Sequence, residues 1–107
     1  MSLPEPSLHI LLINENADEI KLVTTSLRSF FVGCRIEAGY SSEDALAFTR
    51  QGDWQIILID QDLSPERGLD LLARLRRNAP YAAILLQTNE SDSHTAVQAL
   101  QHGADFL

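Results

Sequence analysis

With 107 residues, 45% of them hydrophobic, the sequence has the size and composition of one globular domain with a single core, so we expect one domain within these residues. Its formal net charge of −7 at pH 7 argues against direct binding to nucleic acid or to an anionic membrane, because either needs a basic patch. The single cysteine, Cys34, excludes an internal disulfide and a multi-cysteine metal site, and no apolar stretch is long enough to cross a membrane, so we expect a cytoplasmic protein.

The first predicted strand follows a short leader. Residues 1–7 contain two prolines and are expected to be a loose leader or a cloning remnant, with one domain over residues 8–107. The apolar run over residues 8–13 is typical of a buried strand, and it stops at Asn14 and Glu15.

The first predicted helix begins near Ala17. Asn16 is its expected N-cap, and Glu19, three residues later, would complete a capping-box-like pair. Apolar residues then recur at helical spacing, and Gly33 is the expected stop. The residues of this apolar face are Ile20, Val23, Leu27 and Phe30.

Two strands and one helix are predicted in the middle of the chain. A short second strand covers residues 35–38, and a helix capped by Ser42 ends at Gly52. The third strand covers residues 55–59, where isoleucine and leucine dominate, and it delivers Asp60.

Two further helices and the last strands follow. A third helix starts near Leu69 and closes before Pro80, with cations in its last turns that complement the helix dipole. The fourth strand covers residues 83–86, a fourth helix runs over residues 93–102, and residues 104–107 begin a fifth strand. The cations of the third helix are Arg74, Arg76 and Arg77.

Strands that alternate with helices indicate right-handed βαβ units, and therefore an α/β fold with a doubly wound, parallel, five-stranded sheet covered on both faces. In such folds ligands bind outside the carboxyl ends of the strands. Glu15, Asp60 and Thr88 follow three of these ends, so they bring two acids and a hydroxyl to one edge of the sheet.

Two carboxylates at this edge would repel each other. At about 4 Å the repulsion is on the order of 4 kcal/mol at an effective dielectric of 20. A hard divalent cation with oxygen ligands, such as Mg²⁺, would offset it. The alternative is that both acids are simply solvated at a loop edge.

Five features follow one another at fixed spacing. An acidic-pair position follows the first strand, an aspartate follows the third, a glycine lies eight residues and a threonine 28 residues beyond that aspartate, and a small pair precedes the fifth strand. They are Asn14-Glu15, Asp60, Gly68, Thr88 and Gly103-Ala104. In this order the chain resembles the receiver domain of bacterial two-component response regulators, from about His9 to its last residue.

The resemblance implies a flavodoxin-like fold and phosphoryl transfer from a sensor histidine kinase, or a phosphotransfer protein, to Asp60. It also implies Mg²⁺ held by Glu15, Asp60 and the backbone carbonyl of Asp62, with Asn14 acting through a water. Thr88 would hydrogen-bond the phosphoryl oxygens, and the loop and helix after it would switch. An output domain in the same longer chain or a protein partner would respond, and self-association as a homodimer is left open.

Several positions depart from the family pattern. Asn14 replaces the usual first acid, and Asn89 stands where the family has a small residue. Phe106 is the candidate for the switch aromatic, one place before the usual position. The active-site lysine is absent from this chain, whose only lysine is Lys21 in the first helix. We therefore expect a chain truncated in or just after the fifth strand, with the final helix absent.

Two alternatives stay open. One is a degenerate receiver that takes no phosphate and serves as a protein-interaction module. The other is a phosphatase of the haloacid-dehalogenase type, with Asp60 as nucleophile and Asp62 as general acid. That class also needs a lysine and a further acidic pair downstream, and no lysine follows Asp62.

Overall fold

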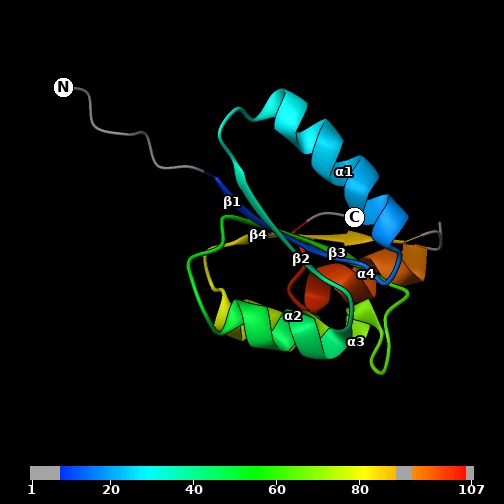
Figure 1. Ribbon diagram of the computed structural model, residues 1–107. Coiled ribbons are helices and arrows are strands. Elements are labelled where there is room, and N and C mark those ends of the chain that lie inside the picture. The colour runs from blue at the N-terminus through cyan, green and yellow to red at the C-terminus, as the bar shows by residue number, and fades with distance from the viewer. Residues whose placement is uncertain (1–7, 89–92, 106–107) are drawn as a thin grey trace.

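The computed structural model describes residues 8–88 and 93–105, in which strands and helices alternate (Figure 1). The elements are β1 (His9–Ile13), α1 (Ala17–Phe30), β2 (Arg35–Gly39), α2 (Ser42–Thr49), β3 (Ile56–Asp60), α3 (Gly68–Asn78), β4 (Ala83–Gln87) and α4 (Ser93–Gln101). The leader predicted over residues 1–7, together with Asn89 and Phe106, lies outside the described residues.

The strands form one parallel sheet in the order β2-β1-β3-β4, which confirms the predicted α/β class. β1 and β3 are central, and each has a run of four apolar residues, as expected for strands covered on both faces. Four strands lie in the described part of the chain. Beyond α4 the backbone N–H of Asp105 donates to the carbonyl of Ile84 at 2.8 Å, so pairing with β4 begins where the fifth strand was predicted.

The helices cover the two faces of the sheet unequally. α1 lies alone on one face, and α2, α3 and α4 lie on the other (Figure 1). Alternate residues of each strand supply the two cores. The larger core joins Leu11, Ile57 and Ile84 to the leucines of α3, and the smaller one packs Ile10 and Leu12 against α1.

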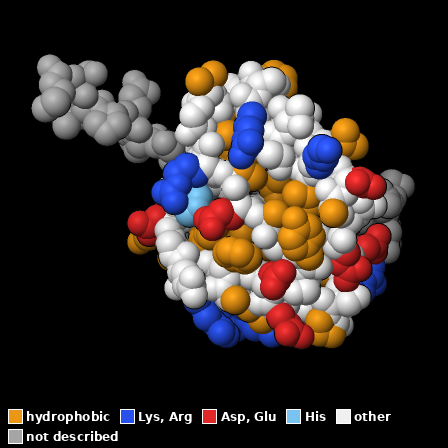
Figure 2. Space-filling model, in the orientation of Figure 1, with side chains coloured by type: hydrophobic (Ala, Val, Ile, Leu, Met, Phe, Trp, Pro, Cys, Tyr) orange, Lys and Arg blue, Asp and Glu red, His pale blue; other side chains and the backbone are white. Residues whose placement is uncertain are grey.

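The edge strand β2 carries charge at its exposed positions, Arg35 and Glu37. Charged side chains on an edge strand hinder pairing with another chain. Figure 2 shows hydrophobic side chains between α1 and α2, over this edge of the sheet, with acidic side chains around them. Half-buried Ile36 and Ala38 of β2 belong to the smaller core.

Three boundary details differ from the sequence prediction. The N-cap of α2 is Ser41, whose side chain accepts from the backbone N–H of Asp44, while Ser42 is helical and buried. The predicted apolar face of α1 is wrong at Phe30, which is 81% exposed, because the helix extends past the edge of the sheet. Gly33 lies beyond the helix end and takes a positive φ of 80° in the following turn.

Arg76 of α3 holds the turn after the C-terminal end of α4 against the rest of the domain through hydrogen bonds. Its guanidinium donates to the carbonyl of Ala82 at 2.6 Å, to that of Gly103 at 2.7 Å and to the Asp105 carboxylate at 2.6 Å. The backbone N–H of Ile84 also donates to this carboxylate. The bonds from Ile84 and Arg76 outweigh partial burial and hold the pKa of Asp105 below its ordinary value.

None of the helices in the described ranges, 8–88 and 93–105, is both long enough and apolar enough to cross a membrane.

Leu72 of α3 is fully buried, whereas Leu22 of α1 is 69% exposed. Leu72→Ala leaves a cavity in the larger core, so we expect a loss of about 2–5 kcal/mol in the free energy of unfolding. Leu22→Ala is the matched control, with an expected change of roughly 0.5 kcal/mol or less. Urea denaturation measures both, and equal losses would contradict the core described above.

Candidate functional site

The carboxyl ends of β1, β3 and β4 bring polar residues to one edge of the sheet. The register pairs Ile13 with Ile59 and Asp60 with Gln87. Asn14 and Asp60, the next residues after the first pair, therefore lie at neighbouring positions on adjacent strands. Asn14 is buried, at 6% exposure, and Asp60 is half-buried. Parallel pairing therefore fixes the distance between these positions without any contribution from the loops.

The Asp60 carboxyl is in an environment that disfavours its charge. Burial is the main reason that its pKa is raised, and the negative charge of Asp62 raises it further. The charge of Glu19 acts in the same direction. Hydrogen bonds from the backbone of Asp62 and Gln61 to the carboxylate lower the pKa, but they do not cancel the combined effect of burial and the neighbouring acids.

Asn14 connects the end of β1 to the start of α1. Its Oδ1 accepts from the backbone N–H of Asn16 at 2.9 Å, and its Nδ2 donates to Oε2 of Glu19 at 2.7 Å. Asn16 is the N-cap of α1, as predicted, and its side chain accepts from the N–H groups of Asp18 and Glu19.

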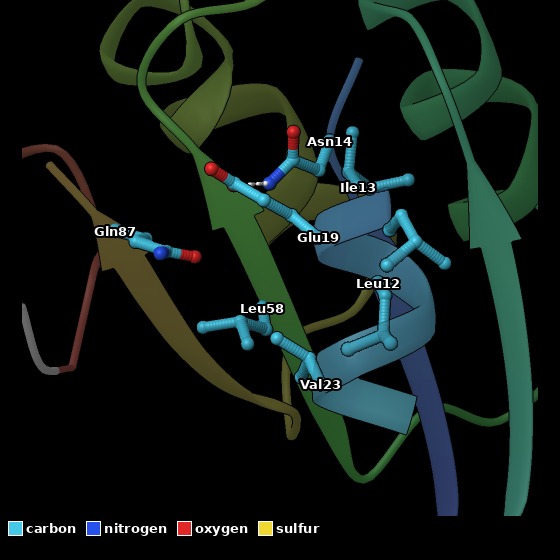
Figure 3. Close-up of a pocket in the computed structure, with 8 residues that line it drawn as sticks. Leu12, Ile13, Asn14, Glu19, Val23, Leu58 and Gln87 are labelled. Carbon is cyan, nitrogen blue, oxygen red and sulfur yellow. Dashed lines mark hydrogen bonds between the residues drawn. The ribbon is translucent and has the colours of Figure 1, made fainter. Parts of the chain in front are cut away.

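The predicted capping box is therefore only half correct. In that motif the third-residue glutamate bonds the N–H of the N-cap residue. Here Asn14 bonds the N–H of Asn16 instead, and the Glu19 carboxylate lies against the Asn14 amide. Figure 3 shows Glu19 reaching from α1 toward the end of β3, with Gln87 facing the same pocket. The pocket is lined by Leu12, Ile13, Asn14, Glu19, Ile20, Val23, Leu58 and Gln87.

Glu15 differs from Glu19 in its relation to Asp60. Both side chains are exposed, but the charges that raise the pKa of Asp60 are those of Asp62 and Glu19. Sequence reasoning used Glu19 only as a capping residue, although its place in the first turn of α1 was a signal for its proximity. The ligand role of Glu15 stays a prediction.

Gly68 and Gln61 fix the backbone around Asp60. A Cβ at Gly68 would lie 2.4 Å from the carbonyl oxygen of Asp60, so α3 can begin here only with glycine. The N–H of Gly68 donates to the carbonyl of Gln61 at 3.0 Å. The buried Gln61 side chain accepts from the N–H of Leu69 at 2.7 Å and so caps α3.

Thr88 directly follows Gln87, the residue that pairs with Asp60, and is half-buried. Pairing in the sheet thus brings the threonine to the same edge as the aspartate. The role of Thr88 toward a phosphoryl group stays a prediction.

The donors at this edge suit a hard cation. Among the described side chains, no group of three or more His, Cys, Asp or Glu gathers closely enough to hold a metal ion by itself. Mg²⁺ needs fewer, since it usually takes one or two carboxylates and keeps several waters. The accumulated negative charge at Asp60 fits such an ion.

Comparison with known proteins gives one family. The model of the response regulator receiver domain matches residues 10–107. The transcriptional regulatory protein ZraR of Salmonella typhimurium is 30% identical over 99 residues, which cover 92% of this chain and 22% of that protein. The alginate biosynthesis transcriptional regulatory protein AlgB of Pseudomonas aeruginosa is 33% identical over 76 residues, 70% of this chain and 17% of that protein. The chain thus spans less than a quarter of the length of these relatives.

Solved structures agree. A response regulator protein from Burkholderia pseudomallei, crystallised with a phosphorylated aspartic acid, calcium ion and citrate, is 28% identical with a TM-score of 0.85, over 94% of this chain and 58% of that chain. A two-component response regulator from Clostridium difficile has a TM-score of 0.86 at 22% identity, over 94% of this chain and 82% of that chain, and supports the fold alone.

Because burial and neighbouring acids raise the pKa of Asp60 above the ordinary 3.8, its charge opposes folding at neutral pH. Its favourable contribution is present below pH 3.8 and is lost as pH rises through the raised pKa. We therefore expect Asp60→Asn to raise the unfolding temperature at pH 7 by a few degrees, after allowing for solvent screening. The difference should shrink as pH falls toward 3.8.

Thermal unfolding followed by circular dichroism from pH 7 downward measures this difference. Asp70→Asn is the control, because Asp70 lies exposed in the first turn of α3, where a negative charge is favourable. A lower unfolding temperature for Asp60→Asn than for Asp70→Asn at pH 7 would contradict the assigned environment.

Proposed function

This chain belongs to the response regulator receiver domain family, and on that premise we propose that Asp60 is its phosphoacceptor. Receiver domains are signalling modules rather than turnover enzymes, and those of response regulators interact with histidine kinases and output domains. This assignment leaves the haloacid-dehalogenase alternative without support. The observation that carries the proposal is a half-buried carboxylate at the carboxyl end of a central parallel strand, with acids beside it.

The proposed reaction is a transfer between two side chains. An oxygen of the Asp60 carboxylate attacks the phosphorus of a phosphohistidine on a sensor kinase or phosphotransfer protein. The P–N bond breaks, its electron pair returns to the imidazole nitrogen, and an aspartyl phosphate forms. The backbone donors from Gln61 and Asp62 keep the carboxylate oriented. The phosphorylated aspartic acid of the Burkholderia relative supports this chemistry for the family.

We propose a Mg²⁺ requirement for this transfer. Glu15, Asp60 and the backbone carbonyl of Asp62 would hold the cation, and Asn14 would act through a water. When bound, the cation neutralises charge on the transferring phosphoryl group. The calcium ion in the Burkholderia structure is an oxygen-seeking cation of the same kind.

Thr88 is the proposed switch residue. A phosphoryl group adds a charge of about −1.5 to −2 and three acceptor oxygens, which a hydroxyl can meet as donor. Because Thr88 directly follows β4 and precedes α4, movement of its side chain would be transmitted toward α4. We propose that an output domain in the same longer protein, or a separate partner, reads this change. A cytoplasmic location and homodimer formation stay predictions.

Incubation of the protein with a small-molecule phosphodonor and Mg²⁺ should raise its mass by one phosphoryl group, as measured by mass spectrometry. Asp60→Asn should abolish the gain. Asp70→Asn is the control and should retain it, because Asp70 is an exposed acid in the first turn of α3 with no proposed part in the transfer. No gain in the wild-type protein would instead favour the degenerate receiver.

A second measurement addresses the switch. Phosphodonor treatment should change amide hydrogen exchange in peptides covering residues 88–102, while peptides from α2 should keep their rates. Unchanged exchange over residues 88–102 in a protein shown to be phosphorylated would remove the proposed switch and leave the phosphoacceptor intact.

A further inference from the structure

Glu19 is an acidic residue at the site that the family pattern did not predict. It lies in the first turn of α1, outside the acidic pair that follows β1. Its carboxylate is nevertheless held at the end of β1 by the 2.7 Å hydrogen bond from Asn14. Asn14, which stands at the position of the family's first acid, thus binds the carboxylate of Glu19.

This arrangement depends on both ends of the Asn14 side chain. Because Oδ1 bonds the N–H of Asn16, the N-cap does not need the Glu19 carboxylate. Because Nδ2 is a neutral donor, it orients the carboxylate without cancelling its charge. Asn14 is also buried, so its side chain has little freedom to turn away.

The Glu19 charge is directed at the proposed site. Its carboxylate lies 2.7 Å from the Asn14 amide, at the end of the strand that pairs with β3. Its charge is also one of those that raise the pKa of Asp60. Figure 3 shows the Glu19 side chain extending from α1 toward the end of β3. One negative charge is therefore restored close to where an acid at residue 14 would have placed it.

We propose that Glu19, positioned by Asn14, supplies the negative charge that residue 14 lacks, and that it accepts hydrogen bonds from water molecules bound to the cation. This inference rests on the proposed Mg²⁺ requirement. A role through water agrees with the absence, among the described side chains, of any acidic group compact enough to bind a metal alone. Partners of this kind typically change metal affinity 10–100-fold.

Titration calorimetry with MgCl₂ tests the proposal without any phosphodonor. Glu19→Gln keeps the length of the side chain and an oxygen that can accept from Asn14, so only the charge is lost. We expect its Kd for Mg²⁺ to rise by about 10-fold or more. Asp18→Asn is the matched control, since Asp18 is an exposed acid in the same turn, and its Kd should stay within about 2-fold of wild type.

Exchanging the amide and the carboxylate between residues 14 and 19 tests whether Glu19 acts through its charge or only through its contacts. In the double variant Asn14→Asp with Glu19→Gln, the amide donor moves to residue 19 and the carboxylate to residue 14. The Mg²⁺ affinity should return to within about 3-fold of wild type, because a purely structural role for Glu19 gives no reason for rescue. Circular dichroism confirms that each variant is folded.

The outcomes distinguish this inference from the proposed function. Wild-type binding that Glu19→Gln leaves within 2-fold would overturn the role of Glu19 and leave the Mg²⁺ site standing. Weakened binding without rescue in the double variant would also overturn it. No Mg²⁺ binding by the wild-type protein would remove the cation requirement and this inference together.

Discussion

The parallel register of β1, β3 and β4 is the constraint on which the rest of the structure depends. It aligns three strand ends at one edge, so Asn14, Asp60 and Gln87 are placed by backbone hydrogen bonds between buried apolar strands. Shifting one strand by a single residue would turn its core side chains to the opposite face. Core packing therefore protects the geometry of the site.

Electrostatics at this edge follow from that placement. Asp60 is half-buried at the edge where the strands end, and Asp62 and Glu19 add further negative charge near it. The electrostatic energy of these like charges is unfavourable when the site is empty. It becomes favourable when a cation, or the positively polarised phosphorus of a donor, binds there. The same cluster of negative charge thus lowers the folding stability and would attract the cation and the phosphoryl donor.

Sequence reasoning placed the fold and most of the edge because both arise from local patterns. Apolar runs of strand length, separated by helical spacing, predicted the alternation of elements, and Asp60 marked the end of β3. Two features were not predicted from the sequence, because each depends on which hydrogen-bond partner a side chain finds in the folded chain. The Glu19 carboxylate had two possible donors, the backbone N–H of Asn16 and the side-chain amide of Asn14. Only the fold shows that the Asn14 amide binds it. The sequence predicts only that Arg76 complements the dipole of its helix, whereas in the fold it also binds the carbonyl of Gly103, 27 residues away.

The Arg76 contacts have a mechanical consequence. They attach the turn after α4 to α3 and β4 through Gly103, Ala82 and Asp105. A displacement of α4 would therefore be smallest at its C-terminal end, where these hydrogen bonds hold it, and would grow toward its N-terminal end. Arg76 would then be the pivot of α4 in the switch proposed for Thr88.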